Sequence, residues 1–286
     1  MTTIFTNFVN SKKNVRLSMQ KRILIVSQEV SPYTTNGLLS ESVLELAKKV
    51  KKNKDTEVRL FMPKYGCVNE RRHQLHEVIR LSGVNIVVND IDQPLIVKVA
   101  SIPQARLQVY FIDNEEYFRR KVTLFDSSEK LVSDNDERII FFCRGVLETL
   151  QMLGWSPDII HCHGWFTSLL PMYLKSIYKQ NTVFEHTKII SSIYNSGFNG
   201  TLDKMIFDKI KFDGIEENLI TNLKKPNFES LNMHAVKFSD GVIFEDDSSK
   251  SKISEFVTKN GIASLSPEVD TDYYNFYQNF FSEALV

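Results

Sequence analysis

Short apolar segments and amphipathic segments alternate along the first part of the chain. Residues 22–27, Arg-Ile-Leu-Ile-Val-Ser, form an apolar run typical of a strand buried on both faces. Residues 38–50 carry apolar side chains at helical spacing, and residues 58–62 form a second apolar run that ends at Pro63. A strand, a helix and a strand in this order predict an α/β fold. We expect a Rossmann-like, doubly wound and mainly parallel sheet with helices on both faces.

The middle of the chain is rich in β-forming residues. Residues 78–89, 95–101 and 106–112 are predicted as strands or hairpins joined by Gly83 and Pro94. Their closeness in the sequence favours a β-rich insertion or an extension of the same sheet over a separate domain.

The second half returns to alternating strands and helices. Asp134 and Glu137 have the spacing of a capping box ahead of a helix that we expect to end near Leu153. Further elements follow: strands over 158–160, 188–194 and 240–244, and helices over 167–178, 231–238 and 248–259. Residues 201–228 are polar, and no element is predicted there.

The end of the chain is unusually aromatic. One helical face carries Tyr273, Phe276, Tyr277, Phe280, Phe281 and Ala284. A helix with such a face must be buried, so we expect a terminal helix that docks on the rest of the chain. The sequence has no repeat and no low-complexity linker. We therefore expect a single domain over residues 21–286, preceded by a flexible tail over residues 1–20.

The composition limits the compartment and the partners. The chain has 35 basic and 35 acidic residues and a net charge of zero, which argues against nucleic acid or an anionic membrane as partner. Three cysteines far apart, Cys67, Cys143 and Cys162, favour a reducing compartment. The first 18 residues lack the apolar core of a signal peptide, and we find no apolar span long enough for a bilayer. The cytoplasm is expected.

The segment Pro157-Asp-Ile-Ile-His-Cys-His-Gly-Trp165 carries the strongest chemical signal. Ligands of open α/β sheets bind beyond the carboxyl ends of the strands, which is where His161, His163 and Trp165 are expected. Our interpretation places the two histidines on opposite faces of the strand, one toward the cleft and one toward the core. Trp165 is interpreted as a sugar-stacking platform or as a core residue at the start of a helix.

A metal site is the rival interpretation of His161-Cys162-His163. Two observations argue against it: the expected divergence of the two histidines, and the lack of an obvious further ligand cluster. We therefore expect no metal and no cofactor.

Several segments in the same order resemble bacterial glycogen synthases and plant starch synthases. They are Gln28-Glu-Val-Ser-Pro-Tyr33, Arg59-Leu-Phe-Met-Pro-Lys-Tyr-Gly66, Tyr110-Phe-Ile-Asp-Asn-Glu-Glu-Tyr-Phe118, Asp134-Asn-Asp-Glu-Arg-Ile-Ile-Phe-Phe142 and the His161 segment. The resemblance implies one half of a GT-B glycosyltransferase, the N-terminal domain of an enzyme that transfers glucose from ADP-glucose to an α-1,4-glucan. In that family a C-terminal domain supplies most of the nucleotide-sugar site, and we expect it to be absent here.

Three positions depart from the family pattern. Thr35 stands where the family has a lysine that contacts the donor phosphates, Gly164 where it has an aspartate, and Tyr194 where it has a histidine that reaches the donor sugar. We therefore assign no residue a catalytic role. The expected ligand-binding residues are Glu29, Thr35, Asn36, Gly37, His161, His163, Trp165, Tyr194 and Asn195.

Three hypotheses about function follow from the resemblance and its departures. The first is a synthase-like domain that is weak or inactive alone, a pseudoenzyme that binds α-glucan or regulates glucan synthesis. The second is an active glucosyltransferase subunit that borrows a donor domain from a second synthase chain or closes its cleft as a homodimer. The third is an α/β binding protein whose ligand is not a glucan.

Overall fold

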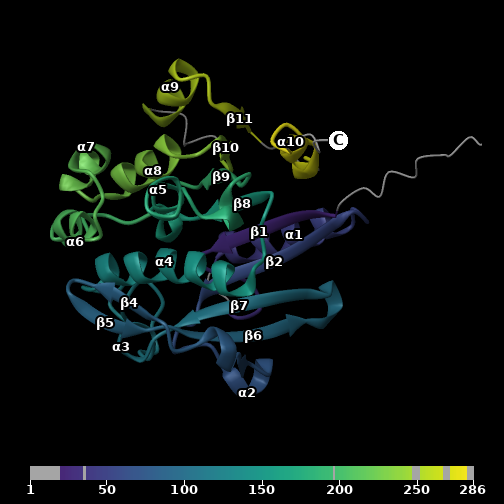
Figure 1. Cartoon of the computed structure of the whole chain (residues 1–286), viewed down its shortest axis with the longest axis horizontal. Coiled ribbons are helices and arrows are strands. Elements are labelled where there is room, and N and C mark those ends of the chain that lie inside the picture. The colour runs from purple at the N-terminus through teal and green to yellow at the C-terminus, as the bar shows by residue number, and fades with distance from the viewer. Residues whose placement is uncertain (1–19, 35–36, 196, 247–251, 267–270, 282–286) are drawn as a thin grey trace, which may run out of the picture.

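The computed structural model describes residues 20–34, 37–195, 197–246, 252–266 and 271–281. The strands are β1 (Lys21–Ser27), β2 (Thr56–Pro63), β3 (His76–Glu77), β4 (Asn85–Val88), β5 (Ile91–Pro94), β6 (Ile96–Ile102), β7 (Leu107–Asp113), β8 (Ile159–His163), β9 (Lys188–Ile193), β10 (Gly241–Phe244) and β11 (Ala263–Leu265). The main sheet has the order β11-β10-β9-β8-β1-β2-β7-β6-β3 (Figure 1). From β11 to β7 every neighbouring pair is parallel, while β6 runs antiparallel to both β7 and β3. The predicted fold class is confirmed.

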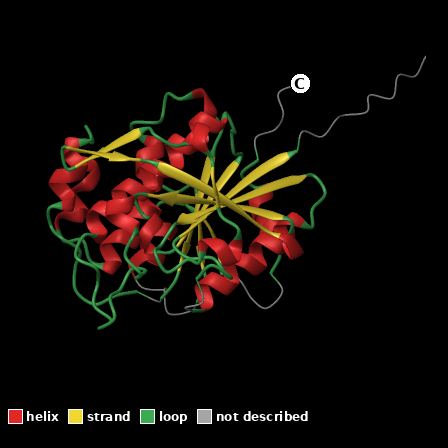
Figure 2. Cartoon of the chain, turned by 90° about the horizontal axis from the view of Figure 1, so that it is seen from below, coloured by secondary structure: helices red, strands yellow, loops and turns green. Residues whose placement is uncertain are grey.

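Helices lie on both sides of the twisted sheet (Figure 2). The α-helices are α1 (Leu38–Lys51), α2 (Glu70–His73), α3 (Glu115–Phe118), α4 (Asn135–Leu153), α5 (Leu170–Lys175), α6 (Ile206–Phe212), α7 (Glu217–Ile220), α8 (Phe228–Lys237), α9 (Lys252–Lys259) and α10 (Tyr273–Gln278). Among the described residues, no helix combines the length and the apolar character needed to cross a membrane.

The apolar patterns explain why the central elements form. All four residues of the run Ile23–Val26 are fully buried, as expected for a parallel strand covered on both faces. Helix α1 turns its apolar residues, among them Val43 and Ala47, toward the core. Its last turn carries lysines, whose positive charges interact favourably with the negative end of the helix dipole. Gly154 ends α4 in the left-handed conformation that glycine adopts readily.

The middle block differs from its prediction at one end. Strands β6 and β7 match the predicted 95–101 and 106–112. The predicted strand over 78–89 is wrong in its first half, where residues 79–81 form a 3₁₀ turn that leaves Ile79 82% exposed. Only β4 remains, and it pairs with β5 in a separate two-stranded hairpin. The turn between them has Asn89 and Asp90 at positive φ, which is the conformation that tight hairpins require.

Other boundaries also shift. Helix α4 begins where predicted, but the Asp134 side chain makes no cap hydrogen bond and instead pairs with Arg120. The predicted helix over 167–178 is a 3₁₀ turn, Trp165–Thr167, followed by the short α5. Helices α6 and α7 and strand β11 were not predicted. The expected flexible tail over residues 1–20, the start of the predicted helix at 248–251, and Ala284 lie outside the described residues, apart from position 20.

Candidate functional site

The candidate site lies at the carboxyl end of β8, in the middle of the main sheet. Strand β8 runs between β1 and β9, and its last residue, His163, is level with Ser27 on one side and Ser192 on the other. His161 and His163 are both fully buried. The structure therefore brings the predicted histidines to the strand end where ligands of such folds bind.

The two histidines lie on the same face of β8. Their ring centroids are 3.9 Å apart. The prediction that they point to opposite faces is wrong, because side chains alternate along a strand and residues two apart share a face. The first argument against a metal site therefore does not hold.

Tyrosine hydroxyls hold one nitrogen of each histidine ring. The hydroxyl of Tyr277, on α10, lies 2.7 Å from Nδ1 of His161. The hydroxyl of Tyr194, in the loop after β9, lies 2.8 Å from Nδ1 of His163. The β8 histidines are therefore held from two sides: Tyr194 of the loop after β9 holds His163, and Tyr277 of the terminal helix holds His161.

A carboxylate completes the cluster. Nε2 of His161 lies 2.8 Å from Oγ of Ser192, and that hydroxyl donates to Oε1 of Glu245 at 2.5 Å. The other carboxylate oxygen of Glu245 accepts from the Tyr273 hydroxyl of α10 at 2.9 Å. Glu245 follows β10, so three strand ends and the terminal helix meet at one point. We call His161, His163, Ser192, Tyr194, Glu245, Tyr273 and Tyr277 the histidine cluster.

Burial keeps the rings of the cluster neutral at pH 7. It lowers the pKa of His163 to about 3 and, together with the nearby His163, lowers the pKa of His161 well below its usual value. Burial also raises the pKa of Glu245, although the hydrogen bonds from Ser192 and Tyr273 oppose that shift. The pKa of the Tyr194 hydroxyl is raised for the same reason, so this group acts as a hydrogen-bond partner and not as a base.

The side chain of Gln28 occupies the space beside Gly164. Gly164 has φ 83° and ψ 159°, a region that is essentially restricted to glycine. A Cβ atom placed there would lie 2.4 Å from Oε1 of Gln28, and that oxygen accepts a hydrogen bond from the Phe166 N–H. Gln28, which directly follows β1, therefore occupies the space that a side chain at position 164 would need.

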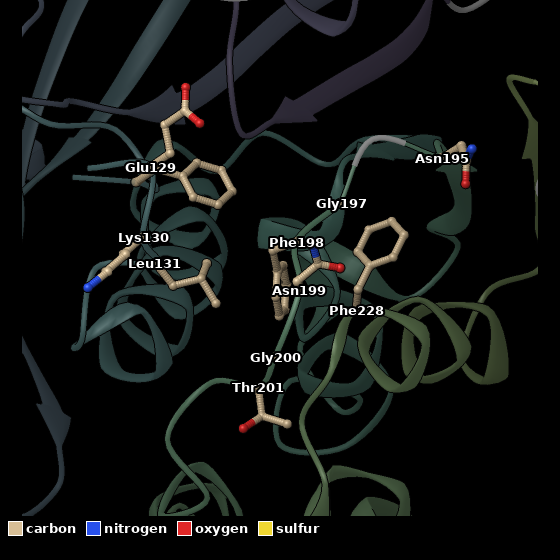
Figure 3. Close-up of a pocket in the computed structure, with 11 residues that line it drawn as sticks. Glu129, Lys130, Leu131, Asn195, Gly197, Phe198, Asn199, Gly200, Thr201 and Phe228 are labelled. Carbon is tan, nitrogen blue, oxygen red and sulfur yellow. The ribbon is translucent and has the colours of Figure 1, made fainter. Parts of the chain in front are cut away.

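The loop after β9 forms one wall of an open pocket of about 670 Å³. Phe198 and Phe228 contact each other there, with ring centroids 6.0 Å apart, and the segment 129–131 lies across from them (Figure 3). The predicted residue Asn195 is exposed and lines this pocket. Trp165 is 2% exposed and packs edge-on against Phe198, which favours the interpretation of Trp165 as a core residue.

Two of the remaining predicted residues, Glu29 and Gly37, lie between β1 and the start of α1 in the chain. Glu29 is 8% exposed, and burial raises its pKa to about 7. Gly37 is exposed and caps the start of α1 with φ 126°. Thr35 and Asn36 lie outside the described residues. The structure thus brings His161, His163 and Tyr194 together. Within the described residues, it shows no contact between these three and Glu29 or Gly37.

Sequence reasoning missed Gln28, Ser192, Glu245, Tyr273 and Tyr277. Ser192 and Glu245 could have been found, since each lies at or directly after the end of a predicted strand. The aromatic pattern indicated that the terminal helix is buried, but it held no information about its partner. The contacts of Tyr273 with Glu245 and of Tyr277 with His161 show that the helix docks at the strand ends.

Comparisons with known proteins agree on one family. A family model described as the starch synthase catalytic domain matches residues 22–265. The glycogen synthase of Chlorobium limicola is 40% identical over 190 residues, which are 66% of this chain and 39% of the relative. That of Chlorobium phaeobacteroides is 39% identical over 209 residues, 73% of this chain and 42% of the relative. The chain therefore spans about two fifths of the length of these relatives.

One solved structure shows the same fold. The catalytic domain of starch synthase IV from Arabidopsis thaliana, bound to ADP and acarbose, superposes with a TM-score of 0.70 at 19% identity. The superposition covers 86% of this chain and 50% of that one.

Proposed function

The chain belongs to the family of starch synthase catalytic domains, and we propose that it binds α-glucan as the acceptor lobe of a GT-B glycosyltransferase while having little or no transferase activity of its own. In this proposal residues 21–286 act as one unit, and the unit serves glucan binding or the regulation of glucan synthesis. The observation that carries the proposal is the histidine cluster, in which three of the four ring nitrogens at the end of β8 are bonded to other side chains of the protein.

A glucosyl transfer with retention breaks the bond between the anomeric carbon and the phosphate and forms a bond to an acceptor hydroxyl. Positive charge develops on the sugar ring, and a nearby carboxylate would stabilise it. Here Gly164 has no carboxylate, Gln28 fills the space, and Tyr194 holds His163. Each lost interaction of this kind lowers the rate by about two to three powers of ten.

The open pocket supports glucan binding. Phe198 and Phe228 offer aromatic faces, and sugar rings stack on such faces through their C–H groups (Figure 3). Asn199 and Thr201 supply hydrogen-bonding groups on the same loop. The starch synthase IV structure was solved with ADP and acarbose, which makes a sugar polymer and an adenine nucleotide the first ligands to test on this chain.

Native gel electrophoresis with and without glycogen tests the binding. We expect glycogen to retard the wild-type chain and Phe198→Ala to weaken the retardation about fivefold, since one aromatic contact contributes about 1 kcal/mol. Phe212→Ala is the matched control, because Phe212 is 59% exposed at the end of α6 and does not line the pocket. An unretarded wild-type chain favours a ligand other than glucan.

Incubation with ADP-glucose or UDP-glucose and glycogen tests the activity. We expect no detectable elongation by the purified chain. Turnover at ordinary enzyme rates would contradict the proposal. Turnover that appears only when a second synthase chain is added would replace it with the second hypothesis, an active subunit that borrows a donor domain.

A further inference from the structure

Three side chains with metal-binding atoms converge in the histidine cluster. One ligand atom from each of His161, His163 and Glu245 lies within 4.8 Å of the other two. The residues come from the ends of two strands, β8 and β10, which fixes their backbones. We propose that these residues form a binding site for a divalent transition-metal ion of the Zn²⁺ class. This site is independent of glucan binding in the open pocket.

Each proposed ligand residue has two polar side-chain atoms, and a tyrosine hydroxyl already bonds to one of them. Tyr277 holds Nδ1 of His161, Tyr194 holds Nδ1 of His163, and Tyr273 holds Oε2 of Glu245. Metal-binding histidines and carboxylates need such partners, which orient the ring or carboxylate and direct the other atom toward the ion. The cluster therefore has an outer shell for each of its three ligands.

The second nitrogen of His161 and the second carboxylate oxygen of Glu245 face a common point. The Ser192 hydroxyl lies 2.8 Å from Nε2 of His161 and 2.5 Å from Oε1 of Glu245, so it marks a position that both can reach. Nε2 of His163 is buried and has no hydrogen-bond partner in the part of the chain that the structure describes. A buried polar atom without a partner is unfavourable, and an ion bound by its lone pair would satisfy it.

The geometry and chemistry fit Zn²⁺ better than hard cations. Ligand bonds of about 2.1 Å in a tetrahedron place ligand atoms about 3.4 Å apart, so the side chains must move inward by about 1 Å, with Ser192 rotating aside. Two imidazoles and one carboxylate match a zinc site that keeps a fourth position open. Mg²⁺ and Ca²⁺ prefer oxygen ligands alone and would bind poorly here.

Metal binding to the tag-free chain tests the inference. After treatment with EDTA and buffer exchange, titration with ZnCl₂ against a chromophoric chelator should give one equivalent with a dissociation constant of about 1 µM or lower. MgCl₂ should not compete. Co²⁺ should give a visible ligand-field spectrum that an excess of Zn²⁺ abolishes, which reports tetrahedral coordination without any variant.

Variants separate this site from surface binding. Glu245→Gln keeps the shape of the side chain and should weaken Zn²⁺ binding at least tenfold, and Tyr194→Phe, which removes only a positioning hydroxyl, should weaken it about tenfold. Glu116→Gln and His186→Ala, at exposed positions, should leave it unchanged. Equal affinity in the wild type and Glu245→Gln overturns the inference, and so does the absence of both stoichiometric Zn²⁺ binding and a Co²⁺ spectrum. Because glycogen retardation is measured separately, its loss or retention leaves this result unaffected.

Discussion

Substitution of Gly164 tests whether the site has been filled by the protein itself. A side chain at Gly164 faces two obstacles: the backbone conformation, with φ 83° and ψ 159°, and the Gln28 side chain. Gly37 provides a matched control. It has φ 126° and ψ 168°, in the same glycine-restricted region, but a Cβ there meets no atom of the described residues within 4 Å.

The two obstacles have separable magnitudes. Backbone strain at such a position costs about 1–3 kcal/mol. Displacement of Gln28 breaks its hydrogen bond from the Phe166 N–H and leaves that donor buried, which adds about 2 kcal/mol. We therefore expect Gly164→Ala to lower the free energy of unfolding by about 3–5 kcal/mol, and Gly37→Ala to lower it by about 2 kcal/mol less.

Urea unfolding of a double-mutant cycle measures the crowding directly. In the Gln28→Ala background, Gly164→Ala should cost only the strain, which gives a coupling energy of about 2 kcal/mol. A coupling energy near zero, or equal effects of Gly164→Ala and Gly37→Ala, would refute the view that Gln28 fills the space. For the same reason Gly164→Asp alone should not produce transferase activity.

Two buried titratable groups should give stability profiles of opposite sign. Burial lowers the pKa of His234 from 6.5 to about 3, so its contribution is complete above pH 6.5 and is lost as the pH falls. The free energy of unfolding of the wild type, measured with urea, should therefore be higher at pH 8 than at pH 5, and His234→Gln should reduce this difference by about 2 kcal/mol. An unchanged difference in the variant would contradict this assignment. Burial raises the pKa of Glu29 from 4.5 to about 7, so stability is lost as the pH rises through that window. In the same assay the free energy of unfolding should fall by about 3 kcal/mol between pH 4 and pH 8 because of Glu29, and Glu29→Gln should abolish this fall. If the variant keeps the fall, another group causes it.

Much of the fold could be predicted because its signals are local. The apolar runs of β1, β2 and β8 and the periodicity of α1 and α4 depend on nearby residues alone, and these elements are confirmed. The errors occur where distant contacts decide. Residues 79–81 continue an apolar pattern, yet they form a turn whose neighbours hydrogen-bond to β6. The Asp134 side chain binds Arg120 instead of the helix start, and helix spacing holds no information about that arginine.

The site was predicted only in part, for two different reasons. The position of His161 and His163 at a strand end followed from the fold class, while their relative orientation was misassigned although strand periodicity alone determines it. Gln28 and Tyr277 could not have been predicted. Gln28 reaches a glycine 136 positions away in the sequence, and Tyr277 reaches His161 across 116 positions.

The histidine cluster joins the terminal helix to the strand ends of the main sheet. Tyr273 and Tyr277 of α10 reach Glu245 and His161 at the strand ends, where ligands of open α/β sheets bind. Groups that satisfy one another in a dry environment are costly to separate, because each must be left unpaired before a ligand can replace its partner. A neutral glucan exchanges hydrogen bonds for hydrogen bonds there and gains little. A divalent ion adds a bond to the one proposed ligand atom that has no partner among the described residues, Nε2 of His163. The same packing that disfavours a sugar at the end of β8 therefore favours an ion there.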